Sequence, residues 1–397
     1  MIRVERRELT GTAFRNYATS FAIPQMPSDQ ERSAAWDSPY DALRGTTDIA
    51  TMRSKGAFFT GPALATELWA TDIDSLADGS VVFDPAAGAG DLLLPAAGVA
   101  QAKGLDLRLR INDIEDAFLR IATKRLVASG GPTVHVESSQ QDFLIDQHNL
   151  EDVTHVVLNP PYIPVTAELG WASGKVNAAA IFVTAALSKM QPGAILLALL
   201  PDVLRSGTRY SRWRDEVESL GRVTDLQIHG VFDEETDVHV FLLRVVAGEA
   251  SGRFQWSGAS TDRTLGQLCN VRVGPVVPHR DPAAGPVVPF VTARNLTSGV
   301  DEVRAFAGRL VGGPMILVNR TSRPGEAPRV RARKREQAEP AAVENHLLVV
   351  TPKVAASPTI HDILKVLQSR QTAEFLDERI RCRHLTVTAL KEIPWPN

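Results

Sequence analysis

The segment THVVLNPPYIP, Thr154 to Pro164, is the part around which this 397-residue chain is organised. Its apolar run, 156–158, has the β-branched character and length of a buried strand, and Asn-Pro-Pro-Tyr (159–162) follows at once. Proline lacks an N–H and pushes the preceding residue away from helical angles, so these four residues are predicted to form a stiff loop at a strand's carboxyl end. An open α/β sheet binds ligands at that edge. The Asn159 amide and backbone carbonyls can accept protons from an exocyclic amine, while Tyr162 can stack on a flat ring.

Length, composition and charge distribution limit the possible classes of protein. A chain of 397 residues with 44% hydrophobic residues is expected to form two or three domains. The two cysteines, Cys269 and Cys382, have no metal-ligand spacing, and they favour a reducing, cytoplasmic compartment. We expect no signal peptide, no membrane span and no metal. The net charge is −3, but residues 320–397 hold 14 Lys/Arg against 9 Asp/Glu, which suggests a lobe built for an anion.

A turn of small residues follows an earlier predicted strand. The sequence VVFDPAAGAGDLLL begins with apolar residues 81–83 and continues through an acid and two glycines. Small residues allow a backbone to approach a ligand closely at the head of a helix. The turn lacks the lysine of a phosphate-binding loop and has an incomplete dinucleotide pattern. Its acid, Asp84, suits the cationic amino group of a methionine moiety better than a pyrophosphate.

Two further strand ends carry acids. The alternating strand within RLRINDIED (108–116) ends in acids, and an acid at the second strand commonly binds ribose hydroxyls; either Asp113 or Glu115 fits. After a helix at about 117–129 and a strand at 134–137 comes Asp142-Phe143-Leu144, which also fits a turn acid beside a core phenylalanine.

Strands and helices alternate from about residue 45 to 248. Further strands are predicted at 194–200, 223–229 and 238–246, with a helix at 177–190 before them. We therefore predict an α/β fold, a doubly wound seven-stranded sheet, preceded by an arm or cap at 1–44. Residues 249–397 are predicted to form a second, β-rich α+β domain, because short β-rich runs alternate there with glycine and proline.

The second domain contains a strongly basic segment. Residues 320–335 hold one acid and seven basic residues: Arg320, Arg323, Arg329, Arg331, Arg333, Lys334 and Arg335. Such a segment fits a solvated tip, or it contacts DNA phosphates and guanine edges.

The motifs together resemble those of S-adenosylmethionine-dependent DNA adenine-N6 methyltransferases of restriction–modification systems. Asn-Pro-Pro-Tyr resembles the catalytic motif of amino-methyltransferases, and DPAAGAG (84–90) resembles their glycine loop. GAFFT (56–60) precedes the glycine loop as in the permuted class, although Thr-Gly-Pro replaces Thr-Pro. The resemblance covers 50–248 well. It covers 249–397 more loosely, through the closing segment RHLTVTALKEIPWP.

The resemblance implies roles for individual residues. Thr60, also a helix N-cap candidate, would hold the methionine carboxylate, and Asp84 the amino group. The other implied cofactor contacts are Ala86, Gly88, Gly90, Asp113, Ile114, Asp142 and Phe143. Asn159 and the Pro160 carbonyl would accept the protons of a flipped-out adenine of double-stranded DNA, stacked on Tyr162 and Phe232; a core role fits Phe232 nearly as well.

The resemblance also implies a separately encoded restriction endonuclease as a partner. Two alternatives remain open. One is a methyltransferase that acts on RNA or on a protein glutamine; the other is a non-catalytic DNA-binding subunit that keeps the fold.

Overall fold

The computed structural model describes the backbone of residues 3–5 and residues 60–232, 238–248, 252–257, 263–278, 280, 284–353 and 358–396. These residues separate into two compact units. One unit holds the described residues of Met1–Leu204, Arg209–Phe232 and Val240–Phe254, and the other holds those of Arg205–Thr208, Asp233–His239 and Gln255–Asn397. No helix in the described part of the chain is long and apolar enough to cross a membrane. Apart from strand β1 (Arg3–Glu5), the arm or cap predicted at 1–44 lies outside the described residues.

The first unit is built on the predicted seven-stranded sheet. In the order of the sheet its strands are β4 (Val134–Gln140), β3 (Leu107–Asp113), β2 (Val81–Asp84), β5 (His155–Leu158), β8 (Ile195–Pro201), β10 (His239–Ala247) and β9 (Gly221–Val231). The five strands from β4 to β8 pair in parallel, and β10 pairs antiparallel to β8. The chain runs from β2 toward β4 on one side and from β5 toward β9 on the other, so the topological switch point lies between β2 and β5.

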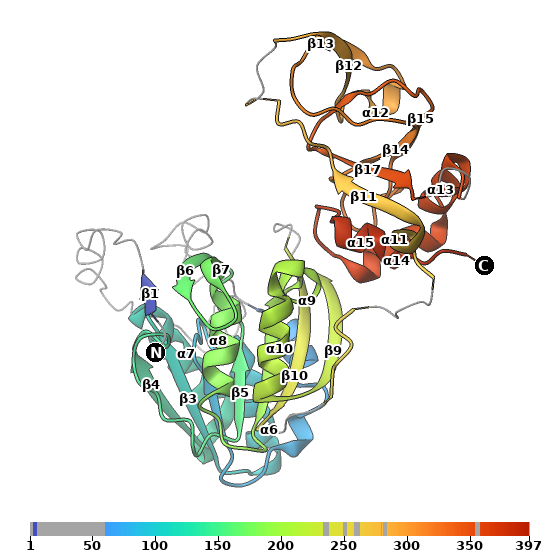
Figure 1. Ribbon diagram of the computed structural model, residues 1–397. Coiled ribbons are helices and arrows are strands. Elements are labelled where there is room, and N and C mark those ends of the chain that lie inside the picture. Colours follow the sequence, from blue (N-terminus) through green and yellow to red (C-terminus); the bar gives the residue numbers. More distant parts are fainter. Residues whose placement is uncertain are drawn as a thin grey trace, which may run out of the picture. The chain divides into compact units, whose positions relative to one another are not determined.

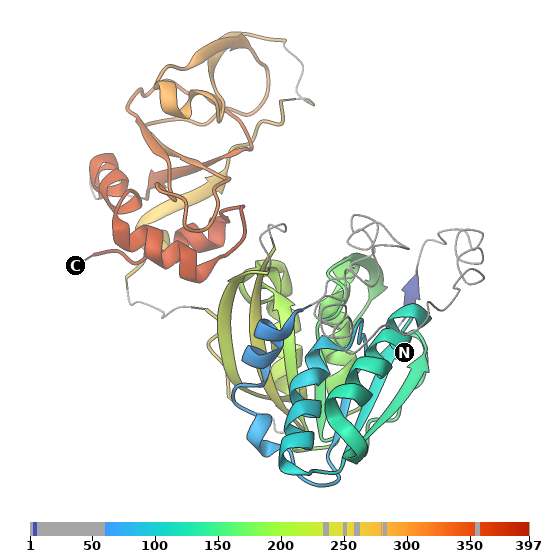
Figure 2. The same cartoon turned by 180° about the vertical axis from the view of Figure 1, so that it is seen from behind.

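Helices cover both faces of this sheet. Helices α5 (Pro62–Trp69), α6 (Leu94–Lys103) and α7 (Asp116–Gly130) lie on one face, and α8 (Ala178–Leu187) and α10 (Ser211–Leu220) lie on the other (Figures 1 and 2). Strands β2 and β5 are buried along their whole length, as expected of parallel strands covered on both faces. Helix α8 is also entirely buried, which explains its run of alanines. The predicted doubly wound α/β fold is confirmed.

A hairpin that the sequence did not reveal follows the Asn-Pro-Pro-Tyr motif. Strands β6 (Pro164–Glu168) and β7 (Ser173–Asn177) pair antiparallel, and β1 adds to the free edge of β6. Five of the ten hairpin strand residues are exposed, so the strands lack the apolar pattern that marks a buried strand. Asn177 ends the hairpin and caps α8, because its side chain accepts a hydrogen bond from the Ala179 N–H at 3.0 Å.

The second unit is β-rich with short helices, as predicted. Strands β11 (Cys269–Val273), β17 (Leu347–Pro352), β14 (Met315–Asn319) and β15 (Ala332–Arg335) form an antiparallel sheet in that order. Strands β13 (Glu302–Ala305), β12 (Val287–Val291) and β16 (Ala342–Val343) form a smaller sheet. The helices of the second unit include α13 (Ile360–Leu367), α14 (Arg370–Arg379) and α15 (Val387–Lys391), which share a core with the four-stranded sheet.

Candidate active site

The glycine turn after β2 has the conformation that its small residues allow. Gly88 and Gly90 have φ angles of 52° and 82°, in the left-handed region that favours glycine. A Cβ on Gly90 would lie 3.1 Å from the Ala122 Cβ, so helix α7 also packs closely against this turn. Two hydrogen bonds from backbone N–H groups of the turn reach the end of β3: the Gly88 N–H donates to Asp113 Oδ2 at 2.9 Å, and the Ala87 N–H donates to the Asn112 carbonyl at 2.9 Å.

Two buried carboxyl groups flank the turn. Asp84 is 1% exposed and, among the described residues, its side chain accepts one hydrogen bond, from the Ala86 N–H at 3.0 Å. Burial raises the pKa of Asp84 to about 8, and the negative charges of Asp113 and Asp91 add to the effect. Burial also raises the pKa of Asp113 to about 6, against hydrogen bonds from the N–H groups of Glu115 and Gly88. Two buried acids whose pKa values are raised by burial are suited to a cationic ligand.

A third buried acid joins the segment around Thr60 to the turn. Asp91 Oδ2 accepts a hydrogen bond from the Gly61 N–H at 3.0 Å, and Asp91 Oδ1 lies 2.7 Å from Arg125 on α7. Arg125 also donates to the Ala89 carbonyl at 2.6 Å. Because Asp91 is only 4% exposed, this buried pair fixes the position of Thr60 relative to the turn. Asp91 was not among the predicted site residues, although an acid in the first helical turn after Gly90 was an available signal.

The structure brings Asn159 together with Thr60 and Tyr162. Asn159 follows β5 at the switch point, and its Nδ2 donates to the Thr60 Oγ1 at 3.0 Å. The Tyr162 hydroxyl donates to Asn159 Oδ1 at 2.8 Å and lies 3.1 Å from the Leu199 carbonyl oxygen at the end of β8. Thr60 therefore does not cap α5: Gly61 occupies the N-cap position, and no side-chain cap is formed. The N-cap prediction for Thr60 was wrong because its hydroxyl is bound to Asn159.

Tyr162 also contacts the predicted second aromatic ring. Its centroid lies 6.4 Å from that of Phe232, and the rings are nearly perpendicular, at 84°. Phe232 is 9% exposed, so it is a buried side chain that reaches Tyr162. Burial raises the pKa of Tyr162 well above its usual range, which keeps the hydroxyl protonated and able to donate.

The other predicted cofactor residues lie at the same strand ends, with different surroundings. Ile114 is 48% exposed and open to contact, and Glu115 is half-buried beside it. Asp142 is half-buried, and its Oδ1 accepts from the Leu144 N–H at 3.1 Å. Phe143 is 2% exposed, and its ring stacks on Phe182 at 5.3 Å. Phe143 therefore has the surroundings of a core residue, the alternative interpretation of this position.

Asn112 is a further residue that the sequence analysis did not single out. Its Nδ2 donates to the carbonyls of Pro85 and Gln141 at 3.0 and 3.1 Å, and its Oδ1 accepts from the Ser139 hydroxyl at 3.0 Å. It is 1% exposed and links the ends of β2, β3 and β4. An asparagine inside an alternating strand was its only signal.

The basic segment of the second unit is not a single exposed loop, and three of its seven members are held internally. Arg329 is 1% exposed; it pairs with Asp377 at 2.9 Å and donates to the Ser322 and Ile380 carbonyls. Arg333 and Arg335, on β15, both pair with Asp301. Ion pairs and carbonyl acceptors hold these three arginines, of which Arg329 and Arg335 are buried and Arg333 is half-buried; charge density alone could not show this.

The other members of the basic segment differ in exposure. Arg320 is half-buried and donates to the Asn345 carbonyl at 3.1 Å. The remaining three are exposed and are called here the exposed basic set: Arg323, Arg331 and Lys334. Arg331 and Lys334 have acidic neighbours, Glu326 at 3.6 Å and Glu336 at 3.0 Å.

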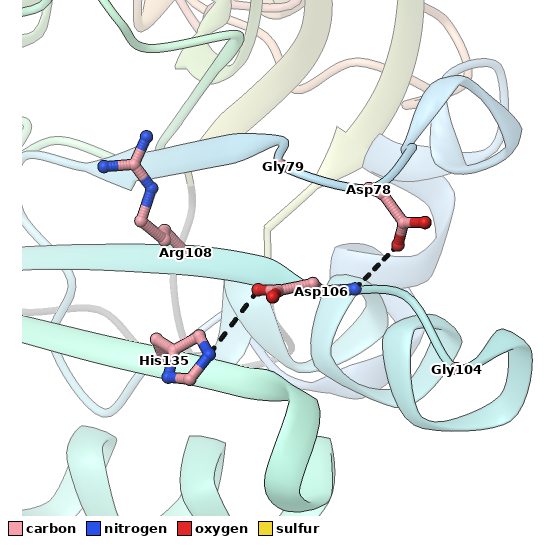
Figure 3. A pocket seen from close by; sticks show the side chains of 6 residues that line it. All are labelled: Asp78, Gly79, Gly104, Asp106, Arg108 and His135. Atoms are coloured by element: carbon pink, nitrogen blue, oxygen red, sulfur yellow. Dashed lines mark hydrogen bonds and ion pairs between the residues drawn. The ribbon is translucent and has the colours of Figure 1, made fainter.

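A hollow of about 780 Å³ in the first unit is lined by none of the predicted site residues (Figure 3). It is lined by Asp78, Gly79, Gly104, Asp106, Arg108 and His135, which precede or begin strands β2, β3 and β4. The hollow therefore lies at the amino ends of the strands, at the opposite edge of the sheet from Asp84 and Asn159. Its one ion pair drawn in Figure 3, between His135 and Asp106 at 3.5 Å, is exposed.

The sequence matches no known family model, and no curated protein is detectably similar to it. Solved structures with a similar fold exist. A Listeria monocytogenes protein assigned to the class I S-adenosylmethionine-dependent methyltransferases is 13% identical over 56% of this chain and 68% of its own, with a TM-score of 0.44. The type IIG restriction endonuclease BpuSI is 14% identical over 90% of this chain and 60% of its own, with a TM-score of 0.43. An rRNA methylase from Streptococcus thermophilus is 16% identical over 48% and 99%, with a TM-score of 0.33.

This chain spans about 60% of the restriction endonuclease's length. The TM-scores are below 0.5 and the identities below 25%, a level at which a likeness says nothing about activity.

Proposed function

We propose that the chain is an S-adenosylmethionine-dependent methyltransferase that modifies N6 of adenine in double-stranded DNA. The observation that carries the proposal is the position of the Asn159 amide. It lies at the switch point of the sheet, beside Tyr162, and its partner Thr60 is tied through Gly61 to the glycine turn. An amine acceptor and a turn suited to a methionine moiety therefore meet at one sheet edge.

The residues around the turn fit S-adenosylmethionine. Asp84 is a buried carboxyl group with one hydrogen bond among the described residues, and a cationic amino group would compensate its charge. Asp113 or Glu115 would hold the ribose, and the exposed Ile114 would lie against the adenine of the cofactor. Ala86, Gly88 and Gly90 allow close approach, Thr60 would bind the carboxylate, and Asp142 would accept the adenine amino protons. When bound, this cofactor supplies a methyl group on a sulfonium centre.

The chain's own residues would orient the target amine. Asn159 Oδ1 and the Pro160 carbonyl would each accept a hydrogen bond from one N–H of the amine. These two hydrogen bonds would draw the lone pair of the nitrogen out of conjugation with the ring. The adenine must leave the DNA duplex to reach them, and Tyr162 and Phe232 would hold it by stacking. This contribution is positioning and electrostatic stabilisation, and it requires no general base of shifted pKa before the methyl group is transferred.

The second unit supports DNA as the substrate. The exposed basic set, Arg323, Arg331 and Lys334, would contact phosphates, and a β-rich unit of this size would contribute the sequence reading. A restriction endonuclease encoded separately is the corresponding partner. Methylation of RNA or of a protein glutamine would use the same site without needing this unit.

Methyl transfer from isotopically labelled S-adenosylmethionine tests the proposal. Duplex DNA should be labelled, mapping should identify N6-methyladenine, and RNA and protein glutamine should remain unlabelled. Asn159→Ala should lower the single-turnover rate at least ~100-fold, as expected for a lost transition-state contact, while cofactor and DNA affinities change little. A near-normal rate in Asn159→Ala would show that this loop does not perform the chemistry.

A further inference from the structure

The amide of Asn159 is held between two hydroxyl groups. Its Nδ2 donates to Thr60 Oγ1 at 3.0 Å, and its Oδ1 accepts from the Tyr162 hydroxyl at 2.8 Å. All three side chains are half-buried, and Thr60 reaches Asn159 across 99 positions of sequence. This arrangement bears on the orientation of the amide, that is, on whether Oδ1 or Nδ2 faces the target amine. Recognition of the amine depends on that orientation.

Only one orientation of the amide presents an acceptor on the side of Tyr162. A half-turn about the Cβ–Cγ bond of Asn159 would exchange the positions of Oδ1 and Nδ2. The amide would then direct N–H groups toward the N–H groups of a target amine, and no hydrogen bond could form between them.

Tyr162 alone does not select the productive orientation. Its hydroxyl carries one proton and, within the described part of the chain, can donate it to Asn159 Oδ1 at 2.8 Å or to the Leu199 carbonyl at 3.1 Å. In the half-turned amide the hydroxyl could donate to Leu199 and accept from Nδ2. Both orientations therefore satisfy Tyr162.

Thr60 can select the orientation when its own proton is used elsewhere. A hydroxyl that donates its proton to a carboxylate can offer Asn159 only an acceptor, so Nδ2 must face Thr60 and Oδ1 must face Tyr162. The Gly61–Asp91 hydrogen bond of 3.0 Å places Thr60 beside the turn where the methionine tail of the cofactor is proposed to bind.

We propose that Thr60 is a positioning residue that couples cofactor binding to target recognition. The cofactor carboxylate accepts a hydrogen bond from the Thr60 hydroxyl. This leaves Thr60 only as an acceptor for Asn159 Nδ2, so the amide is held with Oδ1 toward the target amine. This inference rests on the proposed function. When Oδ1 accepts the amine proton, the Tyr162 hydroxyl can donate to Leu199 instead, so no donor loses its acceptor.

Thr60→Val and Thr60→Ser separate this role from simple packing. Valine keeps the shape of the side chain without its hydroxyl, and serine keeps the hydroxyl. With cofactor and DNA both saturating, we expect Thr60→Val to lower the single-turnover rate about tenfold, the contribution of one ordinary hydrogen bond. Thr60→Ser should stay within about threefold of wild type.

A second readout does not require activity. In ¹⁵N spectra of the full chain, the side-chain NH₂ of Asn159 is the signal pair absent from Asn159→Asp. S-adenosylhomocysteine keeps the carboxylate but lacks the methyl group. It should slow amide rotation and hydrogen exchange of this pair in wild type and Thr60→Ser, and not in Thr60→Val.

The outcomes distinguish the two proposals. A wild-type enzyme that methylates DNA, with Thr60→Val equally fast at saturation and equally responsive to S-adenosylhomocysteine, would overturn the positioning role alone. A wild-type protein that methylates nothing would overturn the proposed function, while the amide signals would still report whether the ligand locks Asn159. A ligand that binds without altering them would overturn the lock.

Discussion

Replacing Asp84 by asparagine should make the protein more stable above neutral pH and weaken its binding of S-adenosylmethionine. The carboxyl group is 1% exposed, and its pKa is raised from 3.8 to about 8. The folded protein therefore keeps a proton between these pH values that the unfolded chain has released. Stability should fall as pH rises through this window, by about 1.4 kcal/mol per unit, and level off above pH 8.

The size of the gain follows from the shift. At pH 8 and above, ionising Asp84 in the folded state costs about 6 kcal/mol relative to the unfolded chain. Asparagine avoids this cost and keeps the hydrogen bond from the Ala86 N–H through its Oδ1. Its buried NH₂ group would need a partner, at a penalty of about 1–3 kcal/mol. We therefore expect a net gain of about 3–5 kcal/mol at pH 8 and, at pH 4, where only the penalty remains, a loss of about 1–3 kcal/mol.

Urea unfolding of the full chain between pH 6 and pH 8 would measure this effect. The raised pKa of Asp113, about 6, adds its own slope mainly below this range in both proteins. Asp74→Asn is the control, because Asp74 is exposed, and a hydrogen bond from Lys103 holds its pKa below the usual value, so removing it should give no gain. Calorimetry should show at least about tenfold weaker cofactor binding in Asp84→Asn, from the loss of a charge-assisted contact. Equal slopes of stability against pH in wild type and Asp84→Asn would refute the reasoning.

Three further predictions concern the buried arginine, the exposed basic set and the glycine turn. Arg329→Met should lower the free energy of unfolding of the second unit by about 2–4 kcal/mol, since it removes the ion-pair partner of the half-buried Asp377 and the donor of the Ser322 and Ile380 carbonyls. A loss below 1 kcal/mol in urea unfolding would contradict that role. Alanine at all three positions of the exposed basic set should instead change stability by less than about 0.5 kcal/mol, and should weaken DNA binding with a flatter salt dependence. Unchanged DNA affinity and salt slope would mean that the set is only solvated. Gly90→Ala should destabilise the protein by about 1–2 kcal/mol, because alanine is strained at a φ of 82°. Gly98→Ala, inside α6 with open space around it, should be neutral or stabilising by up to about 1 kcal/mol. Equal shifts of the melting temperature in the two variants would exclude this explanation.

The parts of the fold that could be predicted are those whose burial requires a recognisable run of apolar residues. Strands β2, β5 and β8 are short apolar runs bounded by turn residues, and their ends lie within one or two positions of the predicted ones. The hairpin of β6 and β7 was missed because half of its strand residues face solvent, so neither strand shows an apolar pattern.

At the site, the residue types and their positions at strand ends could be predicted, but the contacts between them could not. The motifs placed Asp84, Asp113 and Asn159 at neighbouring strand ends, where the structure has them. Which atoms contact which could not be predicted. Thr60 was expected to cap a helix, and its hydroxyl meets the Asn159 amide instead.

The basic segment shows a limit of charge counting. Arg329 and Arg331 are two positions apart, yet one is 1% exposed and the other has a side chain that is 48% exposed. Their environments depend on residues far along the chain, such as Asp377, which no local pattern reveals.

The position of β2 in the sheet has a consequence for synthesis on the ribosome. Strands β2, β3 and β4 are consecutive in the chain and can pair as soon as residue 140 has emerged. The other edge of β2 must wait for β5, which ends at Leu158, and the far edge of β5 must wait for β8, which ends at Pro201. During this interval a buried apolar strand has an open edge, the feature that makes nascent chains associate wrongly. Ribosome pausing between residues 140 and 200 should therefore favour aggregation of the nascent chain, and faster translation of that stretch should protect it.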